Sequence, residues 1–136
     1  MKVRYKITVV GSGYVGMSLS MVLSRQNDVS VLDIDSDRVS IINSGKSTIL
    51  DPDAESFFEN HTLNLNATLD KTEAYRDADF VIVATPTDYD ESTNQFDTSS
   101  VEGVISDVVS LNNDVAIIIK STVPVGFTER IRSEFD

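Results

Sequence analysis

A glycine-rich turn between a predicted strand and a predicted helix constrains the fold of this chain more than any other feature. A short run at 7–10, mostly apolar, leads directly into Gly-Ser-Gly-Tyr-Val-Gly at 11–16. Downstream, apolar residues recur at helical spacing, at Val15, Leu19, Val22 and Leu23. A strand, a Gly-x-Gly-x-x-Gly turn and a helix in this order are typical of a dinucleotide-binding site.

Each glycine of this turn has its own predicted role. Gly11 allows the tight turn out of the strand, Gly13 lets a pyrophosphate approach the backbone, and Gly16 lets the helix pack against the sheet. The free N–H groups and the positive dipole end of the helix that begins near Tyr14 would face the phosphates. We therefore predict that Gly11, Gly13, Tyr14 and Gly16 bind a cofactor.

An acidic residue after the second predicted strand identifies which dinucleotide to expect. This strand, at 29–32, ends in Asp33, about 20 residues beyond the turn. A carboxylate at this place accepts hydrogen bonds from the adenosine ribose, and it would repel a 2′-phosphate. Asp33 therefore predicts NAD rather than NADP. The alternative is that Asp33 is an ordinary solvated acid at a strand end.

Charge and composition exclude several other functions. The 136 residues are the size of one domain. A net charge of −11 disfavours nucleic acids and anionic membranes as partners. With no cysteine and a single histidine, the chain has no disulfide, no cysteine nucleophile and no predicted metal site. No segment is apolar for 18 residues and the N-terminus has no signal-peptide core, so we expect a cytoplasmic protein.

Alternating strand and helix patterns predict the fold class. Short apolar segments at 7–10, 29–32, 65–69, 80–84 and 115–119 read as strands. They predict an α/β, Rossmann-type, doubly wound parallel sheet of strand order 3-2-1-4-5. The segment at 80–84 is apolar throughout, as expected for a strand covered on both faces. We expect a sixth strand beyond residue 136, so that 1–136 is an NAD-binding domain cut short.

Capping signals and apolar spacing predict the helices between these strands. One runs from about 14 to 25, one is capped by Ser36 or Asp37, and one begins near Asp51-Pro52. A short helix at 71–77 is expected to depend on polar contacts more than on the core. Thr98 or Ser99 caps a later helix, and the last helix follows Gly126, with Phe127, Ile131 and Phe135 on one side. The polar stretch at 85–97 is predicted to be a long loop with a functional role.

Polar residues that follow the fourth and fifth strands are further candidates for ligand contact. Ligands of such sheets lie beyond the carboxyl ends of the strands, where strand order reverses. This selects Thr85, Pro86 and Thr87, and then Ser121 and Thr122. The threonines could instead merely end a strand around a proline, or cap a helix ahead of Pro124. Likewise, Arg38 is either an ordinary solvated residue or a contact to the adenosine end of the cofactor, and Lys120 is expected to be a strand-end lysine with its charge in water.

Four motifs together resemble the UDP-glucose/GDP-mannose dehydrogenase family. They are Gly-Ser-Gly-Tyr-Val-Gly at 11–16, Ala-Thr-Pro-Thr-Asp-Tyr at 84–89, Phe-Asp-Thr-Ser-Ser-Val-Glu at 96–102, and Ile-Lys-Ser-Thr-Val-Pro-Val-Gly-Phe-Thr at 119–128. The resemblance runs the full length of the chain with the spacing between motifs intact. It implies oxidation of the C6 alcohol of UDP-glucose to a carboxylate, with two NAD reduced.

The resemblance also implies residue roles. Val15 lies in the turn against the cofactor, Asp33 takes the adenosine ribose, and Arg38 helps to hold that end. Thr87 and Thr122 contact the cofactor nearer the nicotinamide, and Thr122 supports catalysis through a water at the reaction centre.

The family's catalytic cysteine, lysine and asparagine, its central helix with the homodimer contacts, and its UDP-sugar domain would all lie beyond this chain. We therefore expect the chain to bind NAD but not to catalyse, and we expect UDP-glucose as the substrate of a longer, homodimeric protein. Thr48 stands where the family leads us to expect proline.

Two alternatives remain open at this point. The chain could belong to a dehydrogenase that acts on GDP-mannose, another nucleotide sugar or a 3-hydroxyacid, although Tyr89 and Phe96-Asp97-Thr98 favour UDP-glucose. It could also be a non-catalytic NAD-sensing module. The threonines after the fourth and fifth strands argue against the sensor, because a sensor need not arrange groups around the nicotinamide.

Overall fold

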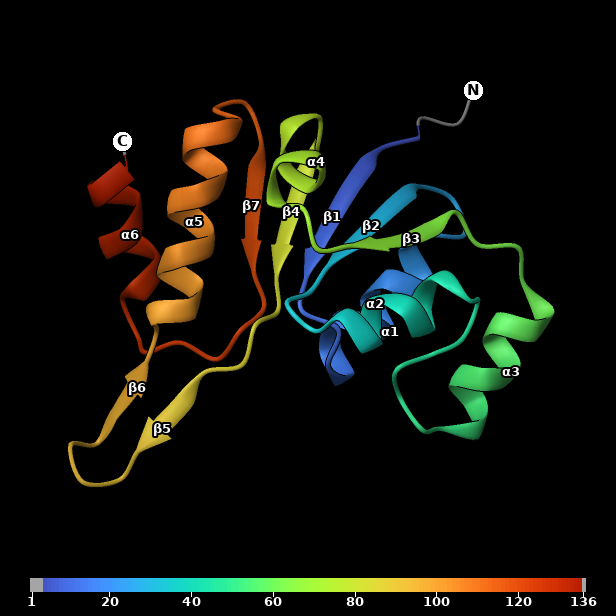
Figure 1. The fold of residues 1–136 in the computed structure, drawn as a ribbon. Coiled ribbons are helices and arrows are strands. Elements are labelled where there is room, and N and C mark those ends of the chain that lie inside the picture. Colours follow the sequence, from blue (N-terminus) through green and yellow to red (C-terminus); the bar gives the residue numbers. More distant parts are fainter. Residues whose placement is uncertain (1–3, 136) are drawn as a thin grey trace.

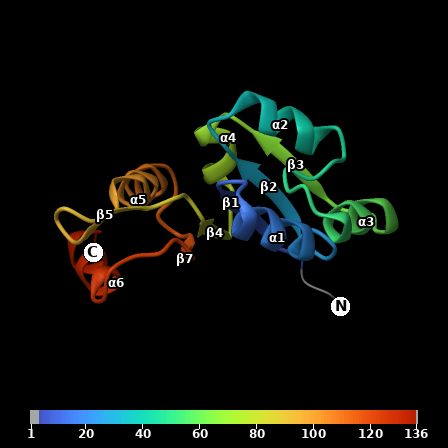
Figure 2. The same cartoon turned by 90° about the horizontal axis from the view of Figure 1, so that it is seen from below.

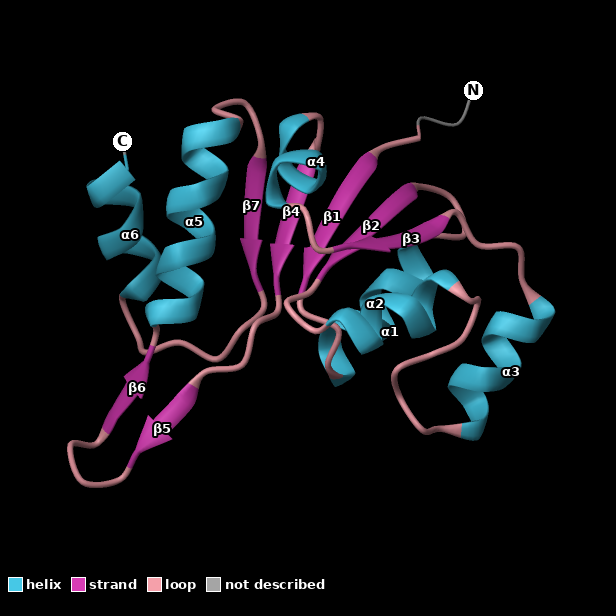
Figure 3. Cartoon of the chain, viewed as in Figure 1, coloured by secondary structure: helices cyan, strands magenta, loops and turns pink. Residues whose placement is uncertain are grey.

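A five-stranded parallel sheet forms the centre of the computed structural model, which describes residues 4–135 (Figures 1 and 3). Its strand order is β3-β2-β1-β4-β7. The strands are β1 (Lys6–Val10), β2 (Asp28–Leu32), β3 (Leu65–Thr68), β4 (Phe80–Val83) and β7 (Ala116–Ile119). Because β7 is the fifth strand of this sheet, the predicted order 3-2-1-4-5 and the doubly wound fold are confirmed.

Six helices connect and flank the strands within residues 4–135. They are α1 (Tyr14–Leu23), α2 (Ser36–Asn43), α3 (Pro52–Asn60), α4 (Lys71–Arg76), α5 (Ser99–Leu111) and α6 (Phe127–Phe135). Figures 1 and 2 show α1, α2 and α3 beside the β1–β3 half of the sheet, and α5 and α6 beside β7. Among the described residues, no helix is long and apolar enough to cross a membrane.

The core lies on both faces of the sheet, because alternate side chains of each strand point to opposite faces. Val10, Leu32, Val81 and Val83 pack with the buried residues of α4, α5 and α6. Ile7, Val9, Val29 and Ile82 pack with Leu19 and Leu23 of α1, while Val31 and Ala67 pack with Met17 and Met21 of α1 and Ile42 of α2. A strand buried on both faces needs the continuous apolar sequence that β4 has, so the prediction for 80–84 is confirmed.

The stretch at 85–97 is not an irregular loop as predicted, because it contains an antiparallel hairpin. Strands β5 (Asp88–Asp90) and β6 (Gln95–Asp97) pair beyond the carboxyl end of the main sheet (Figure 1). The rings of Tyr89 and Phe96 pack across the strands at 5.0 Å, and Asp90 Oδ1 accepts hydrogen bonds from the N–H and hydroxyl of Ser92 in the turn. Each strand is only three residues long and mostly polar, so no apolar pattern in the sequence predicted the hairpin.

Two predictions about helices are wrong. Helix α2 is capped by Asp35, whose Oδ1 accepts hydrogen bonds from the N–H groups of Asp37 and Arg38, rather than by Ser36 or Asp37. Helix α4 does not depend mainly on polar contacts, because its Tyr75 is 1% exposed within the core. Burial raises the pKa of this phenol, since the charged form would lose its hydration.

Candidate cofactor-binding site

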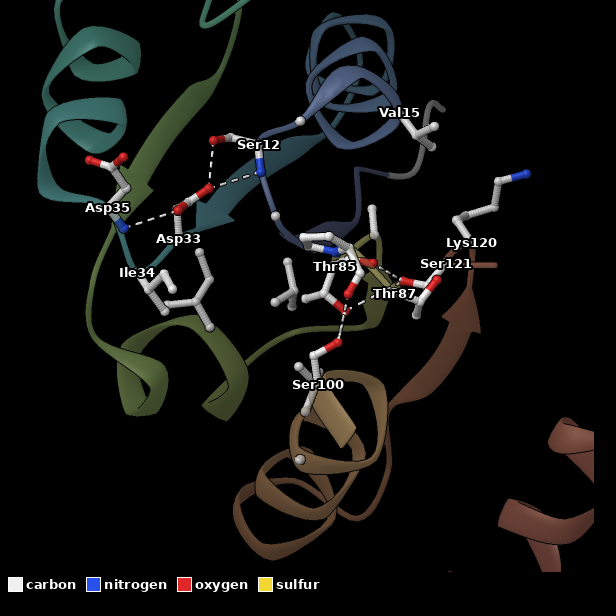
Figure 4. A pocket seen from close by; sticks show the side chains of 18 of the residues that line it. Ser12, Val15, Asp33, Ile34, Asp35, Thr85, Thr87, Ser100, Lys120 and Ser121 are labelled. Carbon is white, nitrogen blue, oxygen red and sulfur yellow. Dashed lines mark hydrogen bonds between the residues drawn. The ribbon is translucent and has the colours of Figure 1, made fainter. Parts of the chain in front are cut away.

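A cavity of about 940 Å³ opens at the carboxyl ends of β1, β2, β4 and β7 (Figure 4). It lies where the strand order reverses, between β1 and β4. The structure brings almost all of the predicted site residues to its wall: Gly11, Gly13, Tyr14, Val15, Asp33, Arg38, Thr85, Pro86, Thr87 and Thr122. Only Gly16 is not in the wall, because it is buried beneath the turn.

The three glycines of the turn have different surroundings. Gly11 has φ +101°, and a Cβ there would lie 2.7 Å from the carbonyl oxygen of Ala84. A Cβ on Gly16 would lie 2.0 Å from the carbonyl oxygen of Gly11, because α1 packs directly on the turn. A Cβ on Gly13 would meet nothing within 4 Å. Gly11 and Gly16 are therefore required for packing, whereas Gly13 leaves space free beside the backbone.

The first turn of α1 offers unpaired backbone donors to this space. Among the described residues, no hydrogen-bond acceptor is found for the N–H groups of Gly13, Tyr14, Val15 and Gly16. The first turn of α1 carries no acidic residue, so no side chain of that turn offsets the positive end of the helix dipole. Free N–H groups at such an end form an anion-binding site, and their arrangement fits a pyrophosphate.

The Asp33 carboxylate is held at the edge of the turn by three hydrogen bonds (Figure 4). Its Oδ2 accepts from the N–H of Ser12 at 2.9 Å and from the Ser12 hydroxyl at 2.5 Å, and its Oδ1 accepts from the N–H of Asp35 at 3.0 Å. A carboxylate has about four acceptor positions. Asp33 therefore keeps acceptor capacity on Oδ1 for a hydroxyl group of a ligand.

The side chain of Arg38 contacts the same turn, although 45% of it is exposed to solvent. Its Nη1 donates to the carbonyl oxygen of Ser12 at 3.0 Å, and its Nε lies 3.8 Å from Oδ2 of Asp35. The hydroxyl of Thr48 donates to the same Ser12 carbonyl at 2.8 Å. Sequence reasoning missed Ser12, although its place between the first two glycines of the turn could have drawn attention to it.

Tyr14 and Val15 begin α1, and their side chains lie outside the core. The Tyr14 hydroxyl donates to Oδ2 of Asp51 at 3.2 Å, and this hydrogen bond, with the nearby negative charge, raises the pKa of the phenol. The Val15 side chain is 49% exposed at the cavity wall (Figure 4). The Tyr14 side chain is thus directed to the start of α3, while the backbone N–H groups of both residues have no acceptor among the described residues.

A group of hydroxyls joins the loops that follow β4 and β7 on the other side of the cavity. Thr85 Oγ1 shares hydrogen bonds with Ser100 Oγ at 3.2 Å and Ser121 Oγ at 3.4 Å (Figure 4), and Ser121 Oγ donates to the Thr85 carbonyl. Ser100 comes from the first turn of α5, and nothing in the sequence pattern set it apart from the serines around it. Hydrogen bonds between residues that are distant in sequence thus connect these loops.

Thr87 and Thr122 are in contact with each other. The Thr87 hydroxyl donates to the Thr122 carbonyl at 2.7 Å. The hydroxyl of Thr122 has no hydrogen-bond partner within residues 4–135. Thr122 is not a helix cap, because α6 begins only at Phe127. Its hydroxyl therefore remains available at the cavity wall.

Comparison with known proteins agrees with this geometry. Residues 5–135 match the model of the UDP-glucose/GDP-mannose dehydrogenase family, NAD binding domain. The chain is 45% identical over 131 residues to UDP-glucose 6-dehydrogenase of Streptococcus pneumoniae, covering 96% of this chain and 33% of that protein. It is 46% identical over 133 residues to UDP-glucose 6-dehydrogenase of Campylobacter jejuni, covering 96% and 34%. The solved structure of a UDP-D-ManNAc dehydrogenase from Pyrococcus horikoshii is similar with a TM-score of 0.82 at 28% identity, covering 96% of this chain and 31% of that one.

The chain spans about a third of the length of the relatives it matches. Within that third, the family match covers the glycine turn, Asp33 and both threonine loops. The predicted cofactor, NAD, and the predicted family are thereby confirmed. The chain belongs to the UDP-glucose/GDP-mannose dehydrogenase family and is its NAD-binding domain.

Proposed function

We propose that this domain serves an enzyme that oxidises UDP-glucose to UDP-glucuronate with two NAD as hydride acceptors. The observation that carries the proposal is the cavity in which free N–H groups and the Asp33 carboxylate meet the Thr122 hydroxyl. UDP-glucose is favoured over GDP-mannose because the two relatives at 45% and 46% identity are UDP-glucose 6-dehydrogenases. In a longer, homodimeric protein, residues beyond 136 would supply the nucleophile and the sugar-nucleotide site.

Different residues of the chain would bind different parts of the cofactor. The N–H groups of residues 13–16 would receive the pyrophosphate, and Asp33 would accept a hydrogen bond from the adenosine ribose. Arg38 would support this end through the Ser12 carbonyl that it contacts. Thr85, Pro86, Thr87 and Thr122 would surround the nicotinamide end, because they lie in the loops after β4 and β7, on the other side of the cavity from Asp33.

NAD bound in this orientation would accept hydride from C6 of the sugar. The domain contributes to that step by orientation, because its hydrogen bonds fix the ring before the reaction begins. The free hydroxyl of Thr122 would hold a water near the reacting carbon. We assign this supporting catalytic role to Thr122 because the neighbouring Thr87 hydroxyl is already bound to backbone.

NAD is expected to bind at least about 10-fold more tightly than NADP, because the Asp33 carboxylate would repel a 2′-phosphate by more than about 1.4 kcal/mol. Isothermal titration of the chain with both cofactors, at one fixed ionic strength, measures this preference. Asp33→Asn should reduce the preference by removing the charge. Asp37→Asn removes the same charge from the exposed first turn of α2, outside the cavity wall, and should leave the preference unchanged. Equal affinity of the unaltered chain for NAD and NADP would contradict the proposed site.

Turnover by the longer protein tests the proposed reaction. Two NADH are expected for each UDP-glucose consumed, measured by absorbance with a known, limiting amount of UDP-glucose, and GDP-mannose and UDP-N-acetylmannosamine are tested as substrates in separate assays. The 136-residue chain alone is expected to bind NAD without turnover. Faster oxidation of GDP-mannose would exclude UDP-glucose as the substrate. Turnover of none of the three, with NAD bound, would favour an NAD-sensing module instead.

A further inference from the structure

Every polar group of Ser12 is engaged by a residue from another part of the chain. Its N–H and hydroxyl are bound to Asp33 at the end of β2, and its carbonyl accepts from Arg38 of α2 and from Thr48 in the loop between α2 and α3. Ser12 is 2% exposed, so water does not compete for these groups. The residue therefore has one fixed backbone orientation.

This orientation determines where the next amide points. Peptide units are planar and trans, so the carbonyl of Ser12 and the N–H of Gly13 point in opposite directions. With the carbonyl held towards Arg38 and Thr48, the Gly13 N–H is directed away from α2 and the loop that follows it. Since Gly13 forms part of the cavity wall and its N–H has no partner among the described residues, this amide is available to a ligand.

The Thr48 hydroxyl makes this contact from a loop that has its own anchor in the core. Ile49, the next residue, is 8% exposed and packs with Met17 and Met21 of α1. Thr48 itself is half-buried. The loop is thus held by Ile49, and removal of the Thr48 hydroxyl should affect the Ser12 carbonyl without releasing the loop.

We propose that Thr48 is a positioning residue for NAD: its hydroxyl holds the Ser12 carbonyl and thereby aims the Gly13 N–H at the cofactor pyrophosphate. This inference rests on the proposed placement of the pyrophosphate over residues 13–16. Arg38 donates to the same carbonyl oxygen, so Arg38 and Thr48 together fix the orientation of this peptide group. Thr48 does not itself line the cavity and, by this geometry, does not contact the cofactor, so it acts only through Ser12.

The test compares Thr48→Val, which keeps the shape and removes the donor, with Thr48→Ser, which keeps the donor. Loss of one hydrogen bond that orients a donor should weaken NAD binding about 5-fold in Thr48→Val. Thr48→Ser should bind within about 2-fold of the unaltered chain. Both affinities are measured by isothermal titration, with thermal unfolding followed by circular dichroism.

A second ligand separates positioning from a general structural effect. Adenosine lacks the pyrophosphate, so its affinity, measured by NMR titration, should be the same in Thr48→Val as in the unaltered chain. Ser47→Ala is the matched control, because it removes the Ser47 contact to the Ile49 N–H in the same loop without touching Ser12, and it should leave NAD binding unchanged.

Three results would overturn the inference: unchanged NAD affinity in Thr48→Val, an equal loss in Thr48→Ser, or a parallel loss for adenosine. If Gly13→Val also left NAD affinity unchanged, the placement of the pyrophosphate itself would be wrong, and the failure would belong to the proposed site rather than to Thr48.

Discussion

Gly13→Val is expected to lower the affinity for NAD about 100-fold while the domain stays folded. The valine side chain would occupy the space that the pyrophosphate needs, and at least two hydrogen bonds to a charged group would be lost, each contributing about 1.5 kcal/mol or more. The fold should tolerate the change, because Gly13 has φ −73° and a Cβ there meets nothing within 4 Å. Isothermal titration with NAD and thermal unfolding measure the two effects separately.

The smaller variant Gly13→Ala gives a graded comparison. A single methyl group takes less of the same space, so its loss of affinity should be smaller than that of valine. Adenosine binding should change little in either variant, because adenosine has no pyrophosphate. If Gly13→Val kept its affinity for NAD, the pyrophosphate would have to lie elsewhere in the cavity.

Gly16→Ala is expected to have the opposite effect, a large loss of stability. Its Cβ would lie 2.0 Å from the carbonyl oxygen of Gly11, and that obstacle is backbone, which cannot rotate away as a side chain can. Helix α1 would have to move off the turn, so the free energy of unfolding should fall by about 3 kcal/mol. Because the total free energy of unfolding of a small domain is only about 5–15 kcal/mol, the midpoint of urea denaturation should shift clearly to lower urea concentration.

Gly103→Ala is the matched control for this measurement. Gly103 lies within α5, and a Cβ there meets nothing within 4 Å. Alanine is favoured over glycine in a helix interior by about 0.5–1 kcal/mol, so this variant should be more stable than the unaltered chain. If Gly16→Ala and Gly103→Ala unfolded at the same urea concentration, close packing of α1 on the turn would be excluded.

The glycine turn and the order of the strands could be predicted because they depend on local patterns. Gly16 is needed for a contact within one strand-turn-helix unit, Gly11 has the positive φ of the tight turn, and Asp33 follows directly from the end of the next strand. The right-handed connection between parallel strands then leaves few possible sheet orders. Because ligands of such sheets lie beyond the carboxyl ends of the strands, the loops after β4 and β7 could also be predicted to lie at the cavity.

The hairpin and the details of the site could not be predicted in this way. Strands β5 and β6 are short and polar, and they pair because Tyr89 and Phe96 meet across them. The predicted caps Ser36 and Asp37 are chemically as suitable as Asp35, and only the backbone path out of β2 selects between them. Contacts of this kind depend on geometry over several residues, which composition and spacing do not record.

By itself, then, the sequence determined the class of sheet, the cofactor and most of the residues at the cavity wall that it singled out, because periodicity and glycine spacing act over a few neighbouring residues. Only the tertiary structure decided how those residues are held. Arg38 and Thr48 lie 26 and 36 residues after Ser12 along the chain, yet both donate a hydrogen bond to the Ser12 carbonyl. Hydrogen bonds between such distant positions depend on how the sheet and its helices bring their ends together.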